Sequence, residues 1–284
     1  MTSIETLLAG LFDYAGLYPP ASLGLRSAAN NYVEYRNSIH AAALGRFIVN
    51  LDRLGELRSI AVDSLGELRL SVIATEDADW ESLSRQIDAG LRVETVEIKC
   101  NQAAAIEQIV RRIPPRLVTY FEVPINASGQ AALEAIGAAG ARAKIRMGGV
   151  IPDAFPSITN VVQMLTALAR FRLPFKATAG LHHPVRSLRP LTYQPEGPAG
   201  IMHGFMNLCC AAALLYSGGE VDEARRTLSE EDAAAWRVEA DALHWRDRSW
   251  TTDQLANLRQ KFFLSIGSCS FEEPIHDLES LGWL

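Results

Sequence analysis

Three of the four lysines of the chain, Lys99, Lys144 and Lys176, stand near the ends of short apolar segments. Lysine and arginine together number 27, so arginine supplies nearly all of the positive charge that hydrates the surface. Lysine, unlike arginine, can lose its proton and act as an amine nucleophile. The positions of these lysines therefore indicate chemistry on a carbonyl compound, and a set of structural ion pairs is the alternative.

Two lysines on neighbouring strands would influence each other strongly. A second ammonium about 6 Å away, at an effective dielectric constant of about 20, disfavours the charged form of the first by about 2.8 kcal/mol. In a Lys144–Lys176 pair, one amine would be the nucleophile and the charge of the other would favour its deprotonation. Close flanking by Glu97 and Glu122 would have the opposite effect and keep both lysines protonated.

The elements that must position these lysines alternate along the chain. Short apolar segments rich in β-branched residues are separated by longer amphipathic ones, which is typical of parallel βαβ units. Helices are predicted over residues 80–90, 102–113, 129–140 and 157–171. Strands are predicted over residues 11–18, 45–51, 68–75, 93–100, 116–124, 141–149, 173–180 and 261–268. Eight strands in a chain of 284 residues predict one α/β domain over residues 1–284, a (β/α)8 TIM barrel.

Two segments do not fit this repeat. Residues 19–38 are long and aromatic, and we expect a helix plus a loop that covers the barrel mouth. Residues 218–257 are acidic and contain three tryptophans, so we expect a helical insertion before the last strand or an oligomer contact. No GxGxxG or GxxxxGK[ST] loop supports an open nucleotide-binding sheet instead.

In a barrel of this kind the active site lies at the carboxyl ends of the strands. Five charged residues near these ends are predicted to be catalytic: Asp13, Lys99, Glu122, Lys144 and Lys176. Eight further polar residues are predicted to bind the substrate: Arg146, Thr178, His182, His183, His203, Asn207, Ser268 and Ser270. Cys100 and Cys269 are interpreted as small core residues rather than nucleophiles.

Four short motifs resemble a known family. "AKIRMGG" at residues 143–149 and "PFKATAG" at residues 174–180 resemble the lysine-bearing strands of class I aldolases of the deoxyribose-phosphate aldolase type. "IGSCS" at residues 266–270 and "LFDYAGL" at residues 11–17 resemble the last and first strands of that family. The resemblance implies that Lys144 forms a Schiff base, that Lys176 favours its unprotonated form, and that Asp13 relays protons or orients the substrate. Glu97 or Lys99 occupies the region of the fourth-strand acid of the family.

The sequence departs from this family where a phosphate would bind. The glycines that hold the phosphate in the family are replaced by "LHHP" at residues 181–184, and Glu272 and Glu273 would repel a dianion. Arg146 and Arg186 could hold a carboxylate instead. These residues favour a lyase that acts on an unphosphorylated oxo-acid or aldehyde and needs no cofactor.

Two other functions remain open. His182, His183 and His203 with Glu122 could bind a divalent metal for a lyase, isomerase or hydrolase, although no HxH or HxxxH spacing is present. A barrel that binds a small molecule without catalysis is the second alternative, because barrel folds host many functions.

Composition limits the partners. The net charge of −6 and the lack of a basic segment argue against nucleic acid. Residues 200–219 are the most apolar, but they include His203 and Asn207 and are short for a membrane span. The first residues contain an early Glu and no positive region, unlike a signal peptide, and the four cysteines form no CxxC pattern. We therefore expect a cytoplasmic protein with reduced thiols that binds a small molecule and can form a homo-oligomer.

Overall fold

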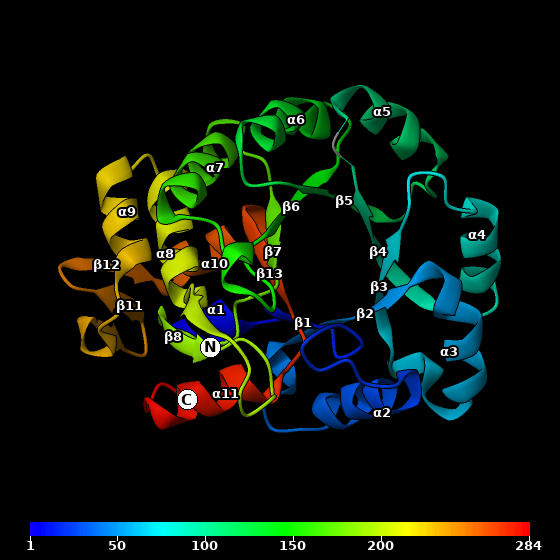
Figure 1. The fold of residues 1–284 in the computed structure, drawn as a ribbon, viewed down its shortest axis with the longest axis horizontal. Helices are drawn as coiled ribbons and strands as arrows, with labels where there is room; N and C mark the ends of the chain where they lie inside the picture. The colour runs from blue at the N-terminus through cyan, green and yellow to red at the C-terminus, as the bar shows by residue number, and fades with distance from the viewer. Residues whose placement is uncertain (101) are drawn as a thin grey trace.

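The computed structural model describes residues 1–100 and 102–284, so Asn101, which follows the fourth predicted strand, lies outside the described residues. Eight parallel strands close into a barrel in the order β1-β13-β7-β6-β5-β4-β3-β2 (Figure 1). These strands are β1 (Phe12–Tyr14), β2 (Leu44–Asn50), β3 (Arg69–Ala74), β4 (Arg92–Lys99), β5 (Val118–Val123), β6 (Arg142–Arg146), β7 (Phe175–Thr178) and β13 (Phe263–Ser268). The prediction of a (β/α)8 TIM barrel with these eight strands is confirmed.

Helices surround the barrel and bury their apolar faces against it (Figure 1). Several begin at side-chain caps: Asp79, Ser157 and Thr251 each accept a hydrogen bond from a backbone N–H of the first turn. The four predicted helices are present. The helices are α1 (Ser3–Leu8), α2 (Leu25–Arg36), α3 (Leu54–Ile60), α4 (Trp80–Asp88), α5 (Ala103–Arg112), α6 (Ala127–Ala138), α7 (Ile158–Arg170), α8 (Phe205–Tyr216), α9 (Val221–Ser229), α10 (Thr252–Lys261) and α11 (Glu272–Ser280). Among the described residues, no helix combines the length and the apolar character needed to cross a bilayer.

The insertion at residues 218–257 is only partly helical, which corrects the prediction. After α9, the chain forms an antiparallel sheet of β10 (Trp236–Val238), β11 (Ala242–Trp245) and β12 (Arg248–Thr251). Trp236 lies opposite Trp245, and Leu243 lies opposite Trp250. All four side chains are buried. Leu243 and Trp245 are two residues apart on β11, so they and their cross-strand partners pack on one face of the sheet.

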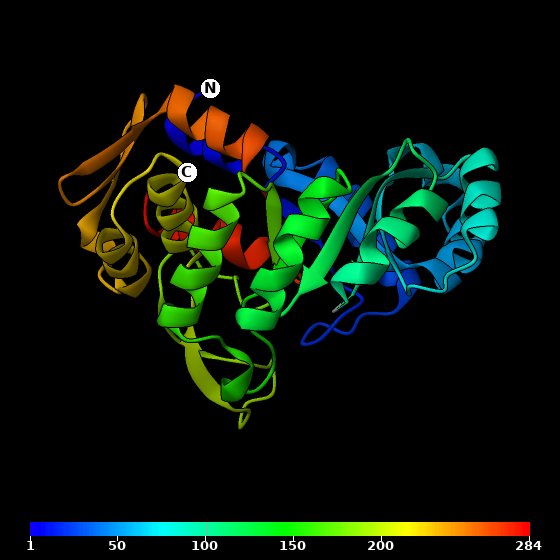
Figure 2. The same cartoon turned by 90° about the horizontal axis from the view of Figure 1, so that it is seen from above.

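Two segments approach the carboxyl ends of the barrel strands. The loop at residues 15–24 brings Tyr18, Pro19 and Pro20 to a cavity wall, and the Tyr18 hydroxyl donates to Asn50 Oδ1 at 2.6 Å. The helix that follows, α2, packs beside β2 and α3, and none of its residues lines that cavity. A hairpin of β8 (Ser187–Pro190) and β9 (Ala199–Met202) projects from the body (yellow-green in Figure 2).

A buried arginine on α10 joins the end of α1 to the start of the last strand, β13. The Arg259 side chain on α10 donates to the carbonyl oxygens of Leu7 at 2.8 Å and Ala9 at 3.1 Å, and also to that of Phe263. Burial lowers the pKa of Arg259 to about 10, so the guanidinium remains charged at neutral pH. These bonds satisfy carbonyl groups at the end of α1 and the start of β13.

Arg259→Met should lower the free energy of unfolding by about 3 kcal/mol, because a side chain of similar length would leave three carbonyl groups without their charged donor. Urea unfolding followed by circular dichroism measures this change. Arg111→Met, on the exposed face of α5, removes only a surface ion pair with Glu107 and should change stability little. Equal stability of the two variants would contradict the role assigned to Arg259.

Candidate active site

Six charged side chains form a continuous chain of ion pairs across the barrel interior. Carboxylates and cations alternate in this charge network, which runs through Asp13, Lys176, Glu97, Lys144, Glu122 and Arg146. The Lys176 Nζ atom lies 2.6 Å from Asp13 Oδ2 and 2.6 Å from Glu97 Oε1. The Lys144 Nζ atom lies 2.7 Å from Glu97 Oε2 and 2.8 Å from Glu122 Oε2. Arg146 completes the network, with Nε donating to Glu122 Oε1 at 3.0 Å.

Strand register explains why these residues meet. Glu122 on β5 lies beside Lys144 on β6, which lies beside Lys176 on β7. Successive residues of a strand point to opposite faces. Thr95 and Glu97 on β4 therefore point the same way, and both are buried. The network thus follows from residue parity on four adjacent strands together with β1.

The carboxylate of Asp13 is held from several sides. Its Oδ1 accepts from the backbone N–H of Arg46 at 2.7 Å, and its Oδ2 accepts from the Ser265 hydroxyl at 2.8 Å. Gly45 leaves the room for this approach, because a Cβ atom there would collide with Asp13 Oδ1. Asp13 is 1% exposed, so its position depends on these contacts rather than on water.

Glu97 is the acid that both lysines of the network share. Its Oε1 also accepts from the Ser71 hydroxyl at 2.5 Å. Burial alone would raise the pKa of Glu97, but Lys144 and Lys176 together hold it well below its usual range. Burial alone would lower the pKa of Lys176, but Asp13 and Glu97 more than offset this and raise it. Glu97 and Lys176 are therefore both charged at neutral pH.

Of the two arrangements that the sequence left open, the structure has the one in which acids flank the lysines. Glu97 bridges the two ammonium groups, so Lys176 is not a bare positive charge beside Lys144. Glu122 is the second acid at Lys144. Burial would raise the pKa of Glu122, but Lys144 and Arg146 lower it overall. This corrects the expectation that Lys176 acts on Lys144 directly.

Two cavities meet at Lys144. One has a volume of about 280 Å³ and the other of about 920 Å³, and Tyr18, Ile73, Lys144 and Arg146 line both. Glu97 and Glu122 line the larger cavity. Lys176 and Asp13 line neither. Of the two lysines of the charge network, the one that a ligand can reach is therefore Lys144.

Three other predicted site residues line these cavities. Lys99, at the end of β4, lies on the wall of the larger cavity and beside Glu122 in the register of β4 and β5, and it takes part in none of the ion pairs of the network. Thr178 and His182 line the smaller cavity. His182 reaches it because Ala179 and Gly180 both have positive φ, and a Cβ atom on Gly180 would lie 2.9 Å from Gly148 Cα.

The remaining predicted binding residues stabilise loops and line neither of the two cavities. His183 pairs with Asp277 at 2.7 Å, and His203 Nε2 lies 2.8 Å from the carbonyl of Pro156. The Asn207 amide donates to the carbonyls of Thr227 and Glu230. Ser268 donates to the carbonyl of Ser270, and the Ser270 hydroxyl accepts from the backbone of Glu273.

The four residues of the metal hypothesis do not converge. His182 contacts Glu273, His183 contacts Asp277, His203 contacts a backbone carbonyl, and Glu122 contacts Lys144. Over residues 1–100 and 102–284, no group of three or more His, Cys, Asp or Glu side chains is placed to hold a metal ion. The geometry therefore gives this hypothesis no support.

Sequence reasoning missed the central place of Glu97 and the exposure of Cys269 to a cavity. Glu97 and Thr95 are two residues apart on a predicted strand, so their side chains point to the same face. This spacing is the feature of the sequence that indicates an inward-pointing Glu97. Cys269 directly follows the last strand, so it occupies a strand-end position, but it was assigned to the core. Its Sγ atom lies 3.7 Å from His182 Nε2, in the wall of the smaller cavity.

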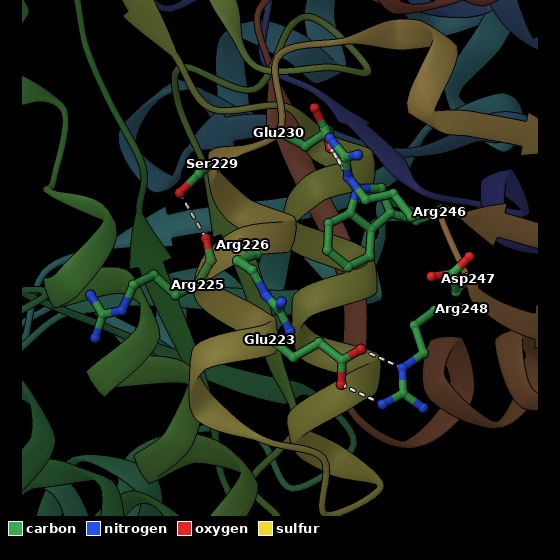
Figure 3. Close-up of a pocket in the computed structure, with 9 residues that line it drawn as sticks. Glu223, Arg225, Arg226, Ser229, Glu230, Arg246, Asp247 and Arg248 are labelled. Atoms are coloured by element: carbon green, nitrogen blue, oxygen red, sulfur yellow. Dashed lines mark hydrogen bonds and ion pairs between the residues drawn. The ribbon is translucent and has the colours of Figure 1, made fainter.

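A third cavity, of about 700 Å³, belongs entirely to the insertion (Figure 3). Its charged residues largely satisfy one another: Arg248 forms a two-bond ion pair with Glu223, and Arg246 pairs with Glu230. No member of the charge network lines it.

Glu97→Gln should destabilise the protein by about 3–5 kcal/mol, because two buried ammonium groups would lose their shared carboxylate. The folded-state pKa of Glu97 is lowered, so its contribution is present above its unfolded pKa of about 4.3 and is lost as the pH falls below that value. Urea unfolding between about pH 6 and pH 3 should therefore show a weaker loss of stability in Glu97→Gln than in the wild type. Glu56→Gln, in an exposed pair with Arg53, is the control. Parallel pH profiles of Glu97→Gln and the wild type would contradict this assignment.

Comparison with known proteins leaves the site to be interpreted from its own chemistry, because no family model matches the chain and no curated protein matches it.

Proposed function

We propose that the protein is a lyase of the class I aldolase kind, in which Lys144 forms a Schiff base with a small, unphosphorylated oxo-acid or aldehyde. The observation that carries this proposal is the position of Lys144. Its Nζ atom lies between two carboxylates, and the residue lines two cavities. An amine with an adjacent base and access to a ligand is what carbonyl addition requires.

The carboxylates have two uses in this chemistry. Glu122 is within hydrogen-bond distance of the Lys144 ammonium and lines the larger cavity, so it is placed to take the proton that must leave before attack. Glu97, whose pKa two lysines hold well below its usual range, stays ionised and stabilises the cation. Addition of the amine to the carbonyl carbon and loss of water then give a protonated imine. The imine nitrogen carries the same positive charge in the same place, so the ion pairs that stabilise the ammonium also stabilise the electron sink.

Lys176 acts as a positioning residue rather than a nucleophile. It is fully buried, contacts two acids and lines neither of the cavities. Its charge keeps Glu97 ionised and fixes one oxygen of that carboxylate, which leaves the other oxygen for Lys144. Asp13 holds Lys176 in turn.

The cavity walls support a carboxylated or neutral substrate. Arg146 lines both cavities and pairs with Glu122 through Nε, and its other guanidinium nitrogens can bind a carboxylate. Ile48, Ile73, Leu191 and Met202 give the smaller cavity an apolar wall. Glu273 lies behind that wall against His182 and disfavours a phosphate dianion. The imine itself provides the electron sink, so the proposal needs no cofactor. All four cysteines are free thiols, which suits the reducing cytoplasm.

Sodium borohydride should trap a substrate-sized mass increment on Lys144 when the protein is incubated with a panel of small aldehydes and 2-oxo acids. Intact-mass measurement and peptide mapping locate the increment, and metal analysis of the same sample completes the test. Lys144→Met should lose both the increment and turnover, since the attacking amine is removed. Lys261→Met, which removes an exposed lysine of α10, should keep both. Turnover by Lys144→Met would overturn the proposal, and binding of a panel compound without an adduct would favour a non-catalytic barrel.

Lys176→Met should lower the rate and move the pH optimum upward. Without Lys176, Glu97 pairs with Lys144 alone and stabilises the ammonium form of Lys144 more strongly, so a higher pH is needed to remove the Lys144 proton. The measurement is the pH profile of kcat/KM for the compound that the trapping experiment identifies. A lower rate with an unchanged profile would show that Lys176 supports the fold alone.

A further inference from the structure

The smaller cavity contains a second group of reactive side chains, apart from the charge network. Cys269, which follows β13, and His182, which follows β7, both line this cavity, as Lys144 does. The Cys269 Sγ atom lies 3.7 Å from His182 Nε2, and His182 Nδ1 lies 2.7 Å from Glu273 Oε2 on α11. Three elements therefore bring a thiol, an imidazole and a carboxylate into successive contact.

The ring of His182 is placed to hold the thiol proton. Burial alone would lower the pKa of His182, but Cys269 and Glu273 more than offset it and raise it to about 10. A ring that is protonated at neutral pH donates one N–H to the Glu273 carboxylate and the other to the sulfur. Sulfur accepts such a bond best as a thiolate, which is also its nucleophilic form.

The other cysteines differ in each of these respects. Cys209 and Cys210 lie in the buried helix α8, where burial raises the pKa of both thiols, that of Cys209 to about 12. Burial also raises the pKa of Cys100. None of these three cysteines lines either cavity at Lys144. They provide internal controls for the reactivity of Cys269.

We propose that Cys269, with His182 as its base and Glu273 orienting that base, is a second covalent site that captures an aldehyde as a hemithioacetal. This inference deepens the proposed function, because an aldol reaction involves two carbonyl compounds. Lys144 would bind one of them, and Cys269 would hold the aldehyde partner in the same cavity.

The step needs no co-reactant. The sulfur forms a bond to the carbonyl carbon, and the π electrons of the carbonyl move to its oxygen. The proton that His182 took from the thiol is transferred to this oxygen, which becomes a hydroxyl. No atom is oxidised or reduced, and the reverse transfer releases the aldehyde. While the aldehyde is held, its carbon cannot rejoin the donor on Lys144, so capture favours cleavage.

The first test measures alkylation of each cysteine by iodoacetamide at pH 7, with peptide mapping of the folded wild type. Cys269 should react at least about tenfold faster than Cys100, Cys209 or Cys210. His182→Gln should remove most of this advantage. Circular dichroism and thermal unfolding show whether the variant is folded. Labelling of Cys269 no faster than of the other cysteines, or labelling that is unchanged in folded His182→Gln, would overturn the inference.

Glu273 variants test the orienting role independently, including the case in which His182→Gln does not fold. Glu273→Asp keeps the negative charge and should retain part of the wild-type labelling rate of Cys269. Glu273→Gln has the same shape but no charge, and it should not. A purely structural contact would tolerate the isosteric amide better. That opposite order would overturn the role assigned to Glu273.

The second test asks whether an aldehyde occupies the thiol. Butanal should slow iodoacetamide labelling of Cys269, and butan-1-ol, which has no carbonyl group, should not. The experiment uses Lys144→Met, so that an imine at this position cannot contribute. No protection by butanal would overturn aldehyde capture. Failure of borohydride trapping on Lys144 in the wild type would instead overturn the Schiff-base proposal, so the two failures are distinguishable.

Discussion

The carboxylate of Glu97, shared between two buried ammonium groups, is the interaction on which the barrel interior depends. An isolated buried charge costs far more free energy than a domain can supply, and each of the two buried lysines has an acid on both sides. Asp13 and Glu122 provide the outer acids, on β1 and β5. The network spans the barrel interior, because its members come from β1, β4, β5, β6 and β7. Its assembly therefore depends on the correct pairing of strands that are far apart in the chain.

The same network places two lysines that look equivalent in the sequence in different environments. Lys176 contacts two acids and lines neither cavity, whereas Lys144 lies beside Glu97 in the wall of both cavities. A protonated imine on Lys144 preserves the charge balance, since one cation replaces another at the same atom. On Lys176 the same reaction would require space that the structure does not provide. The asymmetry comes from position alone.

The fold could be predicted from the sequence because strand and helix periods differ and the strands are apolar. The sheet of the insertion could not, since Trp236, Trp245 and Trp250 stand one to a strand, so no two-residue period links them in the sequence and only their pairing shows that they share a face. Within the site, the alternation of residues along a strand predicts the face to which a side chain points, but not the atoms that it contacts. The sequence therefore identified Lys144 as a candidate, but not the acid shared by the lysines, nor the contact of Cys269 with a histidine on another strand's loop.

Stability alone does not account for this interior. Well-packed apolar residues in place of buried ion pairs are often neutral or stabilising by about 1–4 kcal/mol, and barrel interiors are usually filled by Val, Ile and Leu. Here, the polar layer continues beneath Glu97, where the Ser71 hydroxyl donates to Glu97 and the Thr95 hydroxyl donates to Ser71. Such an arrangement fixes the positions and charges of the acids around one accessible amine. Preorganised acids of this kind are what a developing iminium requires, so the chemistry that we propose at Lys144 would account for the cost of the polar interior.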